Sequence, residues 1–135
     1  GLQNPSFTGW IVEMDFINQI IASKGGLMEV GDERWAISDY VECNLDFDSM
    51  AQVADRLVPG CWLIPHKWNQ GGFDLVGLVE FEQSLMLRFV QVTSSASHGL
   101  NLKYVKDAAS TIITVLNQEI QRIEIVMMRP LDTTN

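Results

Sequence analysis

Cysteine, histidine and basic residues are all scarce in this chain of 135 residues. The two cysteines, Cys43 and Cys61, do not have the spacing of metal ligands, which indicates reduced thiols in an intracellular protein. Nine basic residues stand against 17 acidic ones, giving a net charge of −8. Because the overall field of so acidic a chain does not attract nucleic acid, any phosphate contact needs a local basic patch or a metal ion.

Long apolar runs are also missing. No segment approaches the roughly 18 consecutive apolar residues that span a bilayer, and no signal peptide is visible, so we expect an intracellular domain without membrane contact. Apolar residues are nevertheless abundant, at 47%, which excludes a disordered chain. The length predicts a single domain, and the start at Gly1 without a methionine suggests a fragment of a longer protein.

A helix is predicted for the first element, at about residues 7–23. Its buried face is predicted from the apolar residues at helical spacing, Trp10, Met14, Ile17 and Ile21. Two starts are open: Asn4 caps with Pro5 as the first helical residue, or Thr8 caps instead. Gly25 and Gly26 end the helix, because glycine readily adopts the left-handed conformation there.

The region that follows, residues 27–60, has a weaker pattern. A hairpin of 27–30 with 35–38 and a further strand at 40–45 are compatible with its apolar residues. From Asp48, which we expect to be an N-cap, the spacing becomes helical up to Val58, and Pro59-Gly60 ends the helix.

The second half has a clearer pattern of strands and one long helix. We expect strands at 61–64, 73–80 and 85–93, a helix at about 101–121, and a last strand at 123–128. The strands at 73–80 and 85–93 are apolar on both faces, which is typical of a sheet covered on two sides. The predicted fold class is therefore α/β, a mixed β-sheet with flanking helices.

A hairpin between these two strands brings polar residues together. A short turn centred between Glu82 and Gln83 places Asp74 opposite Gln91, with Thr93 further along the same face. Burying such groups without partners costs about 1–3 kcal/mol each. Either they hydrogen-bond to one another and to a loop at the end of the sheet, or they are oxygen ligands for a hard cation such as Mg²⁺ or Mn²⁺.

The same residues resemble a known family. The pair Phe73-Asp74, the segment Gln91-Val92-Thr93 at the end of the next strand, and a serine-rich loop with His98 before a long helix resemble the nuclease-like domain of retrotransposon hot spot proteins and Crinkler effectors. That domain belongs to the restriction-endonuclease-like PD-(D/E)XK superfamily, whose core is α-β-β-β-α-β. The resemblance implies such a core at 7–23 and 61–128, with 27–60 as an insertion after the first helix.

The resemblance also implies a function and its residues. It implies metal-dependent hydrolysis of phosphodiester bonds in nucleic acid, with Mg²⁺ or Mn²⁺ held by Asp74, by Gln91 in the place of the usual glutamate, and by Glu13 on the first helix. His98 lies beside the site as a general base or phosphate contact, or it is an ordinary hydrogen-bonded loop residue. The implied location is intracellular and includes the nucleus, that of the host cell for an effector.

One departure from the family pattern opens an alternative. The position of the superfamily's lysine is occupied by Thr93, which supplies neither a base nor a cation. Lys103 and Lys106 on the following helix would then supply the catalytic charge, unless both are simply solvated. The alternative is a catalytically silent interaction or regulatory module that binds a protein partner.

Aromatic residues give a further, weaker hypothesis. Trp62, Trp68 and Phe73 would stack bases in a single-strand groove, but core packing explains Trp62 and Phe73 more simply. His66 has no partner at ligand spacing.

Overall fold

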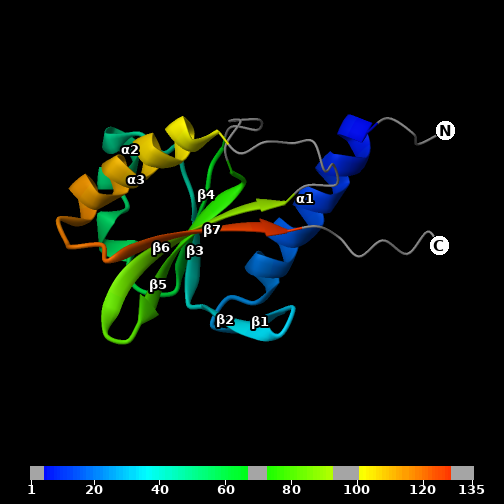
Figure 1. Ribbon diagram of the computed structural model, residues 1–135, viewed down its shortest axis with the longest axis horizontal. Helices are drawn as coiled ribbons and strands as arrows, with labels where there is room; N and C mark the ends of the chain where they lie inside the picture. The colour runs from blue at the N-terminus through cyan, green and yellow to red at the C-terminus, as the bar shows by residue number, and fades with distance from the viewer. Residues whose placement is uncertain (1–4, 67–72, 93–100, 129–135) are drawn as a thin grey trace.

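A five-stranded mixed sheet forms the centre of the computed structural model, which describes residues 5–66, 73–92 and 101–128 (Figure 1). Its strands, in spatial order, are β3 (Asp39–Glu42), β4 (Cys61–Ile64), β5 (Leu75–Phe81), β6 (Ser84–Val92) and β7 (Arg122–Met128). β3 is parallel to β4 and β6 is parallel to β7, whereas β5 is antiparallel to both of its neighbours, β4 and β6. The predicted α/β class and mixed sheet are confirmed.

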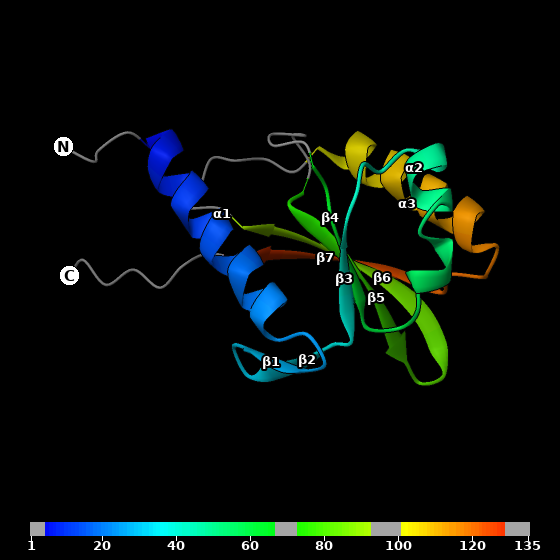
Figure 2. The same cartoon turned by 180° about the vertical axis from the view of Figure 1, so that it is seen from behind.

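Helices and a small hairpin cover the sheet. They are α1 (Pro5–Ala22), the hairpin of β1 (Gly26–Val30) and β2 (Glu33–Ile37), α2 (Phe47–Ala51), the 3₁₀ turn η1 (Ala54–Arg56) and α3 (Leu102–Leu116). Figures 1 and 2 show α1 and the hairpin on one side of the molecule and α2 and α3 on the other. None of the helices described here is long and apolar enough to cross a membrane.

Two apolar cores result, one on each face of the sheet. Residues of β5 and β6 alternate between them, because successive strand residues point to opposite faces. Val76 and Phe89 pack beneath α3, together with Val105 and Ile112 of that helix. Leu75 and Val90 pack on the other face, with Phe16 and Ile20 of α1 and with the hairpin. The prediction of strands apolar on both faces is therefore confirmed.

The β5–β6 hairpin has the predicted turn and register. Phe81 pairs with Ser84 across a two-residue loop, and the ladder runs from there to Leu75 opposite Val90. Glu82 and Gln83 both have positive φ, 51° and 67°, which is the type I′ geometry that fits the twist of a hairpin. No glycine or asparagine marks this turn in the sequence.

The first helix is oriented differently from the prediction. It begins at Pro5, as one of the two predicted starts requires, and Gly25 follows it with φ 86°. Its most buried described residues are Phe16 and Ile20, whereas Ile21 of the predicted face is only half-buried. Phe16 packs edge-on against Trp35 of the hairpin, with ring centroids 6.4 Å apart, so this tertiary contact decides which face is buried.

Two helix boundaries were also wrong. Asp46, not Asp48, is the N-cap of α2, because its carboxylate accepts a hydrogen bond from the Ser49 amide at 2.8 Å. The segment that follows leaves the α-helical conformation and continues as η1. The predicted helix 101–121 ends at Leu116, because Asn117 adopts the left-handed conformation and donates its N–H to Ile113.

Residues 27–60 are joined to the main fold. The predicted hairpin forms as β1 and β2, and the predicted strand at 40–45 forms as β3, which becomes an edge of the five-stranded sheet. This segment therefore supplies part of the sheet and part of both cores.

Stacked aromatic side chains hold the β1–β2 hairpin against the five-stranded sheet. Trp35 of β2 stacks on Trp62 of β4 with ring centroids 5.3 Å apart and planes 11° from parallel. Trp62 in turn lies over Gly77 of β5, where a Cβ atom would come within 2.6 Å of the indole ring. Only glycine at this position lets Trp62 lie so close to the strand.

We expect Gly77→Ala to destabilise the fold by about 1–3 kcal/mol, because the new methyl group displaces the Trp62 ring. The measurement is thermal unfolding, in which each kcal/mol lowers the Tm by about 3–5 °C for a domain of this size. Gly26→Ala is the matched control, since its nearest contact would be an ordinary 3.6 Å. Equal Tm values for the two variants would contradict the close packing of Trp62 on β5.

Candidate functional site

Asp74 lies at one end of the β5–β6 hairpin, beside the backbone of the two residues that flank Gln91. The last pair of the ladder is Leu75 with Val90. One residue further, the Asp74 amide donates to the Val90 carbonyl at 2.8 Å, and Oδ2 of Asp74 accepts a hydrogen bond from the Val92 amide at 2.6 Å. The ladder ends there, and the Asp74 amide bonds to Val90, the partner of Leu75, so the direct opposition of Asp74 and Gln91 stays a prediction.

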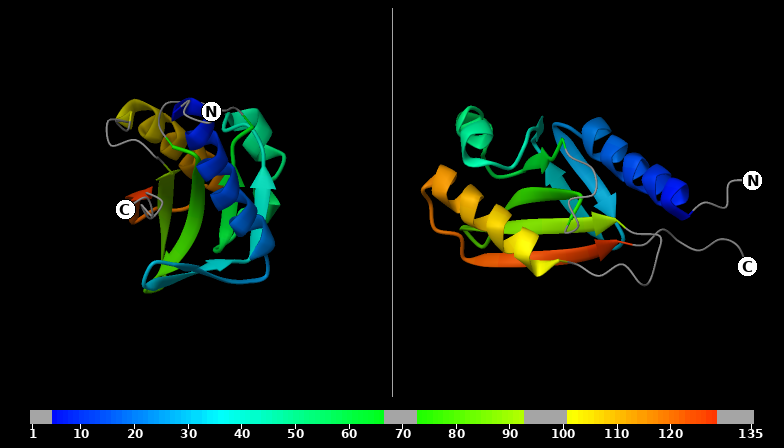
Figure 3. Two further views of the ribbon diagram at one scale, coloured as in Figure 1. Left: turned by 90° about the vertical axis from the view of Figure 1, so that its right-hand side faces the viewer. Right: turned by 90° about the horizontal axis from the view of Figure 1, so that it is seen from above.

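Gln91 belongs to the face of the sheet that α3 covers. Val76 of β5 and Phe89 of β6 pack in the core beneath α3. Gln91 lies two residues after Phe89, so strand alternation puts it on the same face, whereas Asp74 precedes β5 and contacts the backbone of Val90 and Val92. In the right-hand view of Figure 3, α3 runs opposite to β6 and begins at the end of the sheet where β6 finishes.

Gln91 is a polar side chain buried at a core position. The residue is only 8% exposed, and its Oε1 atom has no hydrogen-bond partner in the described part of the chain. A buried carbonyl oxygen without a partner costs about 1–3 kcal/mol. Such an oxygen is a suitable ligand for a hard cation, and the half-buried carboxylate of Asp74 binds the amide of the next residue, Val92.

Of the other predicted site residues, the structure describes the side chains of only two. Lys103 and Lys106 are exposed on the first two turns of α3. Glu13 lies on α1, but its side chain is outside the described part. Thr93 and His98 are outside the described residues altogether. Among the residues that are described, no group of three or more His, Cys, Asp or Glu side chains is placed to hold a metal ion.

Two other sequence hypotheses are decided by burial. Trp62 is fully buried and Phe73 is 6% exposed, so neither presents a face to a base, and Trp68 lies outside the described residues.

Cys43 and Cys61 are buried free thiols. Burial raises the pKa of Cys61 to about 11, and burial followed by the charge of Asp46 raises that of Cys43. Both thiols therefore stay protonated near neutral pH and are poor nucleophiles.

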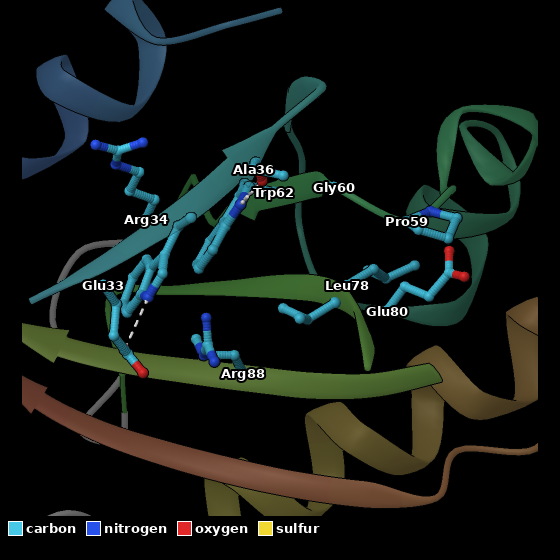
Figure 4. A pocket seen from close by; sticks show the side chains of 11 residues that line it. Glu33, Arg34, Ala36, Pro59, Gly60, Trp62, Leu78, Glu80 and Arg88 are labelled. Atoms are coloured by element: carbon cyan, nitrogen blue, oxygen red, sulfur yellow. Dashed lines mark hydrogen bonds between the residues drawn. The ribbon is translucent and has the colours of Figure 1, made fainter. Parts of the chain in front are cut away.

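The sequence did not predict a pocket that lies on the side of the sheet where the β1–β2 hairpin packs. It has a volume of about 600 Å³ and lies between β2, the start of β4, and the strands β5 and β6 (Figure 4). Arg88 lines it, and the only signal in the sequence was this single charge inside an otherwise apolar strand. The pocket forms because the β1–β2 hairpin packs over the sheet, which no local pattern specifies.

Comparison with known proteins gives no family assignment. No family model, no curated protein and no solved structure matches the chain.

The missing partner of Gln91 has a measurable consequence. We expect Gln91→Met to stabilise the metal-free domain by about 1 kcal/mol, because it removes a buried unsatisfied carbonyl while keeping the side-chain volume. The urea midpoint should rise at an unchanged m-value. Gln52→Met, at an exposed position after α2, should leave the midpoint unchanged. A lower midpoint for Gln91→Met would mean that the amide is satisfied in solution.

Proposed function

We propose that this chain is a nuclease-like domain that hydrolyses phosphodiester bonds of nucleic acid with Mg²⁺ or Mn²⁺ bound by Asp74 and Gln91. The observation that carries the proposal is the buried Oε1 of Gln91, which has no hydrogen-bond partner among the described residues, next to Val92, whose amide binds the Asp74 carboxylate. The element order supports it, because α1, β4, β5, β6, α3 and β7 give α-β-β-β-α-β once the elements of residues 27–60, between α1 and β4, are set aside. This is the order of the PD-(D/E)XK core that the sequence resembles.

Each residue has a defined task in this proposal. Asp74 supplies the negative charge of the site, and its hydrogen bond from the Val92 amide fixes the orientation of the carboxylate. Gln91 supplies a neutral oxygen that burial holds in place. Glu13 is the proposed third oxygen ligand. A bound divalent cation would polarise the phosphodiester and lower the pKa of a coordinated water.

In this proposal, α3 supplies the positive charge that meets the phosphate group of the substrate. Lys103 and Lys106 are exposed on the part of α3 that begins at this end of the sheet, so either ammonium group can meet a phosphate there (Figure 3). The net charge of −8 makes such a local contact necessary, because the field of the whole chain repels nucleic acid. His98 is the proposed general base.

The Asp74 carboxylate provides the direct test of this function. Asp74→Asn keeps an oxygen that accepts from the Val92 amide but removes the charge, so we expect an intact fold and a loss of metal-dependent cleavage of roughly 100-fold or more. The assay uses single- and double-stranded DNA and RNA with Mg²⁺, Mn²⁺ or EDTA. Asp107→Asn, an exposed acid on α3, is the matched control. Equal cleavage by the two variants would contradict the assignment of Asp74.

A catalytically silent interaction module is the second candidate, and two observations favour it. One oxygen of Asp74 already accepts a backbone N–H, which reduces its capacity for a cation. The outer strand β7 exposes Ile123, Ile125 and Met127 by 38–46%, and these three alternate residues share one face of the sheet. Exposed apolar side chains in such a row are typical of protein-binding surfaces.

Cation binding separates the two candidates without any substrate. Under the nuclease proposal, Mg²⁺ or Mn²⁺ at a hundredfold excess over its Kd stabilises the domain by about 2.7 kcal/mol. We expect this gain to raise the Tm of the unaltered protein and to vanish in Asp74→Asn. A Tm that neither cation changes would favour the silent module.

A further inference from the structure

The outer strand β7 is an open edge of the five-stranded sheet. It pairs with β6 on one side, and no strand in the described part of the chain lies on its other side (Figure 3). An unpaired strand edge presents a row of backbone N–H and C=O groups that can hydrogen-bond to a further strand. β7 is therefore a place where another chain can extend the sheet by strand addition.

The two edges of the sheet differ in their protection against such pairing. At the opposite edge, β3 has only four residues, and it begins and ends with the charged residues Asp39 and Glu42. Short length and charge are common protections of an edge strand. β7 has seven residues and no proline, and its two charged residues, Arg122 and Glu124, lie within the first three positions. The rest of β7 carries neither protection.

An exposed apolar row accompanies this open edge. It consists of Ile123, Ile125 and Met127, which lie on the face of the sheet that α3 covers. The ladder places Ile123 beside Leu87 and Ile125 beside Phe89, and both of these β6 residues are buried in the core beneath α3. α3 thus covers the β6 side chains and leaves the neighbouring β7 side chains in contact with solvent, which is typical of a surface that binds protein.

A second copy of β7 matches this row. When two identical strands pair antiparallel about a two-fold axis perpendicular to the sheet, one residue lies opposite itself. With Ile125 at the axis, Ile123 of each copy lies opposite Met127 of the other, and all seven residues of the strand find a partner. Every exposed apolar side chain of the row then meets an apolar side chain, and the two rows form one continuous strip.

The charges of β7 favour this register over its neighbours. Glu124 lies opposite Val126 of the other copy, and its carboxylate already pairs with Arg88, whose Nη2 atom is 3.2 Å from Oε2. An axis at Glu124 would place two glutamates directly opposite each other, which is unfavourable. An axis at Val126 would place Ile123 opposite the charged Arg129, beyond the end of the strand.

We propose that this chain forms a two-fold symmetric dimer, in which the β7 strands of two copies pair antiparallel with Ile125 at the axis and join the two sheets into one. The net charge of −8 makes two copies repel each other over most of their surface, but β7 carries one charge of each sign and is locally neutral. The dimer does not depend on cation binding by Asp74 and Gln91. It assigns to a second copy the row that a silent module would offer to another protein.

The mass in solution tests the dimer. Sedimentation equilibrium from micromolar to millimolar protein should show a rise from the mass of one chain to twice that mass. Ile125→Lys places two ammonium groups opposite each other at the axis, so we expect association to weaken about tenfold or more. Leu27→Lys, the same charge change at an exposed residue of β1, is the matched control. A single-chain mass at every concentration, or equal association constants for the two variants, would overturn the proposal.

Cysteine crosslinking tests the register without adding charge. In the proposed dimer, the two Cα atoms of residue 125 lie about 4.5–5.5 Å apart, within the range that a disulfide bridges. We therefore expect Ile125→Cys to form a covalent dimer under mild oxidation, whereas the native Cys43 and Cys61 are buried. Ile123→Cys is the control, because the two copies of residue 123 are separated by about 13 Å along the strands. No crosslink in Ile125→Cys, or equal yields from the two variants, would rule out this interface.

Discussion

The register of the β5–β6 hairpin is the constraint on which the proposed cation site and the packing of Arg88 both depend. The two-residue loop at Glu82 and Gln83 fixes Phe81 opposite Ser84, and every other pair follows from that one. A slip by a single residue would turn each side chain of one strand to the other face. Gln91 would then leave the α3 face, and Arg88 would leave the face on which Trp35 packs.

The same hairpin divides its polar groups between two environments. On the α3 face, the buried Gln91 oxygen lacks a partner in the described part of the chain, which lowers the stability of the fold. On the other face, Arg88 is buried with Glu124 as its ion partner and Trp35 as its aromatic neighbour. The two cases differ because Arg88 has a clear structural role, whereas the fold gains nothing from the Gln91 carbonyl. For that reason Gln91, and not Arg88, is assigned to the proposed cation site.

Local patterns in the sequence predicted the sheet well and the packing around it poorly. The strands β4, β5 and β6, and the register of the β5–β6 hairpin, follow from short-range periodicity and one tight turn. The predicted buried face of α1 was wrong because the contact between Phe16 and Trp35 joins two elements whose packing no local pattern specifies. The predicted end of α3 was wrong because Asn117 adopts a left-handed conformation, which an asparagine in the sequence indicates only weakly. The Arg88 pocket requires the hairpin to pack on the sheet, which is a long-range event.

Paramagnetic broadening by Mn²⁺ in the ¹H–¹⁵N spectrum of the domain tests the central claim most directly, because it reports where a cation binds without requiring catalysis. The account predicts that substoichiometric Mn²⁺ broadens the amide signals of Asp74 and Gln91 first and leaves the indole signals of Trp35 and Trp62, on the opposite face, much less affected. Broadening centred on another part of the chain, or none at all, would contradict a cation site at the end of this hairpin.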